Sequence, residues 1–189
     1  MTQRAQQKQE TRLHLLQSAS RLMAEGGLVA TRTADVAADS GVSHGALFVH
    51  FARRDDLLLE VVNDLGRRLT DRLYALAGQG LREALLAHVR CLAEEEALYT
   101  RLLMERQQLP EACGLAWMGI QSAVSHHLMR AAEGERLVRT PQHLLFNTWI
   151  GLVHHYLVNR DLFAPRGSVL KKHGRELVDH FLKLARRER

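Results

Sequence analysis

Residues 33–51 read TADVAADSGVSHGALFVHF, and this stretch decides the fold of the first part of the chain. Its small and apolar residues recur at helical spacing, with one glycine between two such segments. The pattern predicts two short helices, over residues 33–39 and 43–51, joined by a tight turn. Two helices joined in this way form a helix-turn-helix, whose second helix enters the major groove of DNA. An ordinary helical hairpin matches the same pattern, so this reading of the stretch alone leaves that alternative open.

Five residues of the stretch have predictable local roles. Gly41 stands where the chain turns sharply, which predicts a positive φ. Thr33 and Ser43 are predicted to cap the two helices, since a hydroxyl oxygen there accepts a backbone N–H of the first turn. Leu47 and Phe51 are four residues apart and are predicted to face the core together.

The longer run from Gly41 to Leu58, GVSHGALFVHFARRDDLL, resembles the signature of the TetR/AcrR family of transcriptional regulators. A preceding amphipathic helix that ends in Gly-Gly is also similar to that family. The usual Tyr of the signature is Phe48 here, so a phosphate contact through that hydroxyl is absent. The usual Pro or Gly is Ala52, which weakens the match at the turn into the next helix.

The resemblance implies a dimeric, ligand-responsive DNA-binding protein, usually a repressor on a palindromic operator, with residues 43–51 as the recognition helix. By this resemblance, the phosphate backbone would be held by Thr33, Ser43 and His50. Base edges would be approached by His44 and by Ala46, the latter at a thymine methyl. Gly45 would permit close approach of the backbone to DNA. The resemblance also assigns Phe48, Arg53 and Arg54 to the DNA-binding surface, Arg54 on a phosphate.

Each assignment has a structural alternative. In this alternative, His44 is an ordinary exposed residue and His50 is partly buried against the first helix. Arg53 and Arg54 are either solvated or paired with nearby acids instead of contacting DNA. Arg4, Lys8 and Arg12 either add minor-groove or electrostatic contacts or belong to a frayed terminus.

The whole chain is predicted to be all-α, with about nine helices. Leu and Ala are abundant and β-branched residues are few, which favours helices. Residues 1–54 are predicted to form a three-helix DNA-binding domain, and residues 55–189 a helical bundle for effector binding and dimerisation. The remaining helices are predicted over residues 9–25, 55–76, 81–106 with a break inside it left open, 110–132, 141–161 and 168–187.

A ligand-binding site in the second domain is the less certain part of this reading. Glu96 lies toward the apolar side of its predicted helix, either as a pocket carboxylate or as an exposed residue of the run 94–96, and the latter is favoured. Large side chains at helical spacing either line an apolar pocket with Gln121 or simply pack in the core. These residues are Trp117, Met118, Phe146 and Trp149.

Residues 144–157 are apolar on more than one face, which indicates either a central helix or a helix shared between the core and a second subunit. With the last helix they suit a four-helix contact across a two-fold axis. The predicted interface of this homodimer contains Leu145, Ile150, Leu152, His154, Tyr156, Leu177 and Phe181.

Composition excludes several other classes. No apolar run is long enough for a transmembrane helix, the N-terminus has no signal-peptide pattern, and two distant cysteines fit a reducing cytoplasm. No catalytic signature is present, and no His pair at chelating spacing predicts a metal. The formal net charge is +5, and residues 1–54 hold seven basic and four acidic side chains. This surplus is small, so the alternative of a helical adaptor or ligand carrier without DNA binding stays open.

Overall fold

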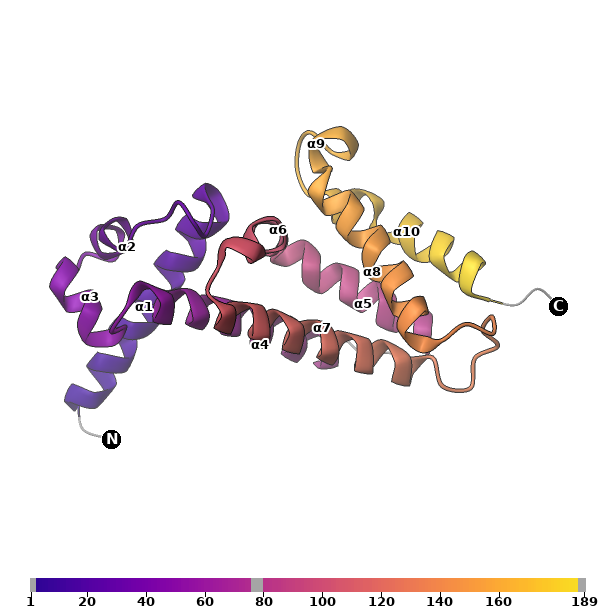
Figure 1. The fold of residues 1–189 in the computed structure, drawn as a ribbon, viewed down its shortest axis with the longest axis horizontal. Coiled ribbons are helices and arrows are strands. Elements are labelled where there is room, and N and C mark those ends of the chain that lie inside the picture. Colours follow the sequence, from indigo (N-terminus) through magenta and orange to yellow (C-terminus); the bar gives the residue numbers. More distant parts are fainter. Residues whose placement is uncertain (1–2, 76–79, 187–189) are drawn as a thin grey trace. The chain divides into compact units, whose positions relative to one another are not determined.

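The computed structural model describes residues 3–75 and 80–186, which form ten α-helices and one 3-10 turn (Figure 1). The described residues contain no strand, and the prediction of an all-α chain is confirmed. The helices are α1 (Gln3–Gly26), α2 (Thr33–Asp39), α3 (His44–His50), α4 (Arg54–Ala75), α5 (Leu81–Glu94), α6 (Glu96–Glu105), α7 (Glu111–Ala131), α8 (Gln142–Val158), α9 (Arg160–Phe163) and α10 (Val169–Ala185), with the 3-10 turn at Arg106–Gln108.

The predicted helix bounds agree with the observed ones within a few residues, except at three places. Helix α1 begins six residues before the predicted start at residue 9. The predicted helix over 81–106 is broken at Glu95 into α5 and α6, and the separate α9 raises the count above the predicted nine. The predicted end of α4 at Leu76, the break at Gly78 and the end of the last helix at Arg187 lie outside the described residues.

The chain divides into two compact units. The first unit contains residues 1–65 and 97–117, and the second contains residues 66–96 and 118–189. Helices α4, α6 and α7 therefore contribute residues to both units. The functional division at residue 54 concerns where DNA and effector bind, and it stays a prediction.

The core of the first unit is built from the buried faces of short helices. Leu15 and Met23 of α1 are buried, as are Val36 of α2 and Leu47 of α3. Phe51, which follows α3, is also buried, and the guanidinium of Arg12 lies 4.8 Å above its ring. The prediction that residues 47 and 51 face the core together is confirmed.

The second unit holds α10 closely against α5. A Cβ atom added at Gly174 of α10 would overlap the side chain of Val89 of α5, so the glycine permits this close approach. Beneath the two helices, Trp149 of α8 packs on Phe181 of α10, and its Nε1–H donates to Nδ1 of His88 at 3.2 Å. Complete burial lowers the pKa of His88 to about 3, so this imidazole is neutral at physiological pH.

A buried carboxylate fixes the start of α10. Glu96, the first residue of α6, is only 6% exposed, and its two oxygens accept the backbone N–H groups of Val169 and Leu170 at 3.0 and 3.1 Å. The hydroxyl of Ser168 donates to the same carboxylate. Because the N-terminus of a helix carries unpaired donors and partial positive charge, the burial of this carboxylate is compensated.

None of the helices in the described residues combines the length and the apolar character that crossing a membrane requires.

Candidate nucleic-acid interface

A glycine turn joins α2 to α3 in the first unit. Gly41 has φ +66°, as predicted, in the region that side chains disfavour. The N–H of Val42 donates to the carbonyl of Ala37 at 3.0 Å, and that of Gly41 to the carbonyl of Ala38 at 3.1 Å. This pair of bonds is the Schellman arrangement, which satisfies the last carbonyls of α2 and reverses the chain within three residues.

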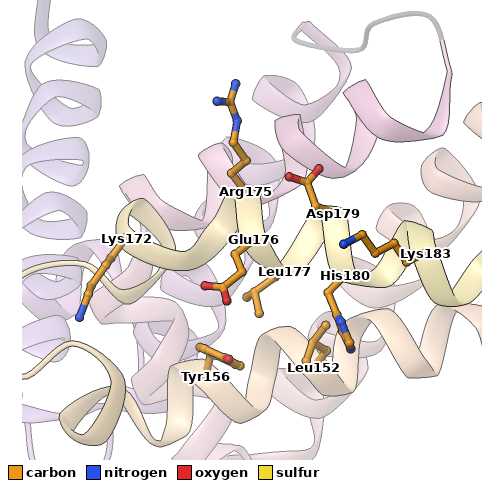
Figure 2. Close-up of a pocket in the computed structure, with 9 residues that line it drawn as sticks. All are labelled: Leu152, Tyr156, Lys172, Arg175, Glu176, Leu177, Asp179, His180 and Lys183. Carbon is orange, nitrogen blue, oxygen red and sulfur yellow. The ribbon is translucent and has the colours of Figure 1, made fainter.

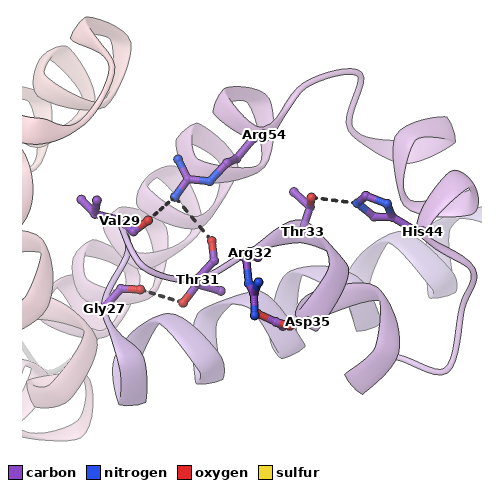
Figure 3. A network of polar contacts seen from close by, with 8 residues as sticks. All are labelled: Gly27, Val29, Thr31, Arg32, Thr33, Asp35, His44 and Arg54. Carbon is purple, nitrogen blue, oxygen red and sulfur yellow. Dashed lines mark hydrogen bonds and ion pairs between the residues drawn. The ribbon is translucent and has the colours of Figure 1, made fainter.

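The two predicted helix caps have different outcomes. Ser43 caps α3, because its hydroxyl accepts the N–H of Ala46 at 3.1 Å, and this prediction is confirmed. The predicted cap by Thr33 is wrong. Arg32 occupies the N-cap position of α2 without a side-chain hydrogen bond, while the hydroxyl of Thr33 lies 2.9 Å from Nε2 of His44 (Figure 3). The threonine therefore connects α2 to α3 instead of closing its own helix.

Helix α3 has a buried face and an open face. Leu47 is completely buried, whereas Phe48 is 41% exposed and Val49 is 69% exposed. Gly45 is also exposed, and no atom lies within 4 Å of the position that its Cβ would occupy. The ring of His44 meets the ring of Phe48 edge to face, with the centroids 5.1 Å apart.

His50, the last residue of α3, is half-buried, as the alternative reading of this residue expects. Its Nδ1 atom is buried without a hydrogen-bond partner in the structure. Burial, together with the nearby charges of Lys8 and Arg12 on α1, lowers the pKa of the imidazole. His50 is therefore neutral at physiological pH, and a phosphate contact would use it as a neutral donor.

Arg54 lies at the start of α4 and holds the turn between α1 and α2. Its Nη2 donates to the carbonyls of Leu28 and Val29, each at 2.8 Å, and to that of Thr31 at 3.4 Å. Figure 3 shows the contacts with Val29 and Thr31. The predicted phosphate contact by Arg54 remains untested, but the structure already gives this guanidinium a positioning role. Arg53 is more exposed and pairs with Asp56 at 3.3 Å.

The same turn is held from α6, a contact that the sequence did not predict. The carboxylate of Glu105 accepts the N–H of Val29 at 2.8 Å. One of its oxygens lies 2.5 Å from the position where a Cβ of Gly27 would stand, so a side chain there would require this carboxylate to shift. Gly27 also has φ +99°. The glycine pair predicts the end of α1, but no local signal points to a partner 76 residues away.

The predicted ligand-binding residues belong to both units. Trp117 belongs to the first unit, where it packs on Tyr99, and the others belong to the second unit. Trp149 is in the core. Met118, which the pocket hypothesis included, is exposed. The preferred reading of Glu96 as an exposed residue is wrong, because its carboxylate is buried against α10; the binding roles of Glu96, Gln121 and Phe146 stay predictions.

The predicted dimer residues fall into two sets. Four are buried inside the second unit of a single chain, and three are partly exposed on α8. The buried set is Leu145, Ile150, Leu177 and Phe181, and the exposed set is Leu152, His154 and Tyr156. An open groove of about 670 Å³ runs between α8 and α10 (Figure 2). Leu152, Tyr156 and Leu177 line it, together with charged side chains of α10.

Histidines of the second unit do not assemble into a metal centre. In residues 3–75 and 80–186 no three His, Cys, Asp or Glu side chains are grouped as a metal ion would require. His127 instead meets Tyr74 edge to face at 4.9 Å, and burial lowers its pKa.

Comparisons with known proteins find bacterial regulators to which this chain is similar. The model of the family described as bacterial regulatory proteins, tetR family, matches residues 15–61. The HTH-type transcriptional repressor Rv3405c of Mycobacterium tuberculosis is 41% identical over 87 residues, which are 46% of this chain and 46% of the repressor. The chain thus matches about half the length of the first curated relatives.

A second relative matches over almost the full chain. The HTH-type transcriptional regulator AcrR of Shigella flexneri is 26% identical over 202 residues, covering 95% of this chain and 91% of AcrR. Solved structures agree in fold. The fatty acid degradation regulator FadR of Bacillus halodurans has a TM-score of 0.75 at 17% identity, over 91% of this chain and 94% of FadR. A TetR family regulator of Agrobacterium tumefaciens also reaches 0.75, at 19% identity over 92% and 98%.

Proposed function

We propose that the protein is a sequence-specific DNA-binding transcriptional regulator, acting as a ligand-responsive repressor, because its residues 15–61 match the model of the family described as bacterial regulatory proteins, tetR family. The observation that carries the proposal is the local geometry of α2 and α3. The Gly41 turn and the Ser43 cap fix α3 in a single orientation. The outer face of α3 stays open, as a helix that enters the major groove requires.

The regulator acts as a homodimer on a palindromic operator. The groove between α8 and α10 supports this part of the proposal, because its apolar floor is flanked by charged residues of both signs. Leu144 of α8 and Leu162 of α9 are exposed apolar side chains on the same segment of the chain. A second copy that covers these residues would remove them from water.

A small-molecule effector releases the operator by changing the spacing of the two recognition helices. Helix α4 supports this part, since its first residues belong to the first unit and its last described residues to the second. The effector can act only if it binds one spacing better than the other. Equal effector affinity for free and operator-bound protein would contradict this mechanism.

Selection of bound DNA from a random pool tests the DNA-binding role. We expect a palindromic site to be enriched, with affinity falling moderately as salt rises because the DNA-binding face is only mildly basic. His44→Ala should change the preferred sequence, and Arg54→Ala should weaken all sites alike. Arg130→Ala, at an exposed position of α7 in the second unit, is the matched control. A pool without enrichment, or strong binding without sequence preference, would contradict the proposal.

Sedimentation tests the dimer. The wild-type protein should sediment as a dimer at micromolar concentration, and Leu152→Glu should shift it toward monomer because the charge would be buried in the contact. Leu115→Glu introduces the same charge at an exposed apolar position of α7 and should leave the dimer intact. A wild-type monomer at this concentration would refute the contact.

A further inference from the structure

The open face of α3 is apolar. Gly45, Phe48 and Val49 stand at positions i, i+3 and i+4 and therefore lie on one side of the helix. Two large apolar side chains are left in water there, while Leu47 on the opposite side is buried. Since nothing lies within 4 Å of the Gly45 Cβ position, this face is also open to close approach by a partner.

Helix α3 offers few side-chain groups that can read base edges by hydrogen bonds. The helix has the sequence HGALFVH and lacks Arg, Lys, Asn and Gln, the residues that bond guanine or adenine in the bidentate manner. His44 uses Nε2 in its bond to Thr33, and Nδ1 of His50 is buried. A helix with this composition can distinguish bases mainly through apolar contact and shape.

Cationic side chains belong to the segments connected to both ends of α3. Arg32 precedes Thr33, the bonding partner of His44, and Arg53 follows α3 by three residues. Both guanidinium groups are largely exposed and pair only with an acid three residues away in the structure, at 3.3 Å. Such surface pairs contribute little to stability, so phosphates can replace the acids. A helix with an apolar open face and exposed cations on the adjoining segments fits a groove of nucleic acid, whose backbone is anionic.

We propose that Phe48 and Val49 read the 5-methyl groups of pyrimidines in the major groove, so that thymine is selected at the positions facing them. The inference rests on the proposed function and specifies its chemistry. The 5-methyl group is the one apolar feature that distinguishes base pairs in the major groove. The part of the specificity that concerns thymine then comes from burying methyl groups against these two side chains, beside the base contact proposed for His44.

The DNA side of the test removes methyl groups one at a time. The half-site found by selection is synthesised with deoxyuridine in place of each thymine, which deletes the methyl and keeps every hydrogen-bonding group. At the positions that face α3 we expect about a fourfold loss of affinity for each methyl, the equivalent of one buried carbon. At the same positions, 5-methylcytosine should bind better than cytosine by a similar factor.

The protein side of the test pairs the same bases with altered side chains. Val49→Ala should weaken binding to the thymine site and have little effect on the deoxyuridine site, because the methyl has then lost its partner. Val49→Thr keeps one methyl at the same place and should retain part of the discrimination. Leu13→Ala removes another exposed apolar side chain of the first unit, on α1, and should change neither.

The outcomes separate this inference from the proposed function. If a site is enriched but deoxyuridine is tolerated at every position, or if Val49→Ala weakens both sites equally, methyl readout is refuted and DNA binding stands. If no site is enriched, both fail. Because Val49 is mostly exposed, its variants should melt within a few degrees of the wild type, which a circular dichroism melt verifies.

Discussion

Helices α3 and α10 use the same two residue types in opposite ways. Each begins after a serine whose hydroxyl accepts a backbone N–H of the first turn, at 3.1 Å for Ser43 and 3.0 Å for Ser168. Each also contains one glycine. In α10 the serine also donates to the buried carboxylate of Glu96, and the side chain of Val89 occupies the space that a Cβ of Gly174 would need. In α3 the serine bonds, among the described residues, only within its own helix, and the space beside Gly45 is unoccupied.

The difference separates a helix that is fixed by its neighbours from one that is fixed by its own ends. Helix α10 buries its apolar face and has its first backbone donors satisfied by another helix. Helix α3 is oriented by the preceding glycine turn and keeps Phe48 and Val49 in water. Because exposed apolar side chains lose the stabilisation of burial, we expect a partner to cover this face of α3.

The largest expected effect comes from removing the carboxylate that holds α10. Glu96→Ala leaves two buried N–H groups and the Ser168 hydroxyl without their acceptor, which should lower the free energy of unfolding by about 3 kcal/mol. Glu94→Ala is the control, because this glutamate is exposed and pairs only on the surface with Arg72. Urea denaturation measures both; equal midpoints for the two variants would show that α10 needs no such anchor.

Acid should weaken the second unit through His88. This imidazole has a pKa of about 3 in the folded chain and an ordinary value near 6.5 in the unfolded chain. As the pH falls below 6.5, His88 binds a proton in the unfolded state but not in the folded state. The free energy of unfolding therefore decreases continuously down to pH 3. At pH 5 the loss is about 2 kcal/mol.

A variant that cannot titrate isolates this contribution. His88→Gln stays neutral and keeps an acceptor for Trp149, so its urea midpoint should fall less steeply between pH 6.5 and 4 than that of the wild type. Parallel slopes for the two proteins would contradict a neutral buried His88.

The two glycines provide the most direct test of the comparison, and Gly45→Ala has the smallest expected effect. Gly174→Ala should destabilise the chain by about 1–3 kcal/mol, since its Cβ overlaps Val89, and Val89→Ala in the same chain should recover part of the loss. Gly45→Ala should instead stabilise the fold by about 0.5–1 kcal/mol, because alanine favours a helix and meets no neighbour. Thermal melts measure both; changes of the same sign would remove the distinction between α3 and α10.

Sequence patterns predicted the elements of the first unit because their signals are local. Gly41 terminates α2 through its own dihedral angles, and Ser43 caps its own helix, so both are visible within a few residues. The cap predicted for Thr33 was wrong, since a histidine eleven residues later competes for its hydroxyl. Local preference decides only where no tertiary partner intervenes.

The contacts of Glu96 and Arg54 could not be read in this way. A continuous helical projection placed Glu96 toward the apolar side, but the break at Glu95 and the partners more than seventy residues later give that carboxylate its role. The motif assigned Arg54 to a phosphate, whereas three backbone carbonyls of an earlier turn bind it. Backbone partners leave no trace in residue identity, which is why these contacts were missed.

The hold of Glu105 on the Gly27 turn has a consequence for protein engineering. Exchanging the first 54 residues for those of a related protein would bring in a new turn while keeping the old carboxylate, whose hydrogen bond to the N–H of Val29 the new turn would have to reproduce. A chimera that preserves this contact therefore takes two crossovers, so that the segment 97–117 is transplanted together with the N-terminal helices.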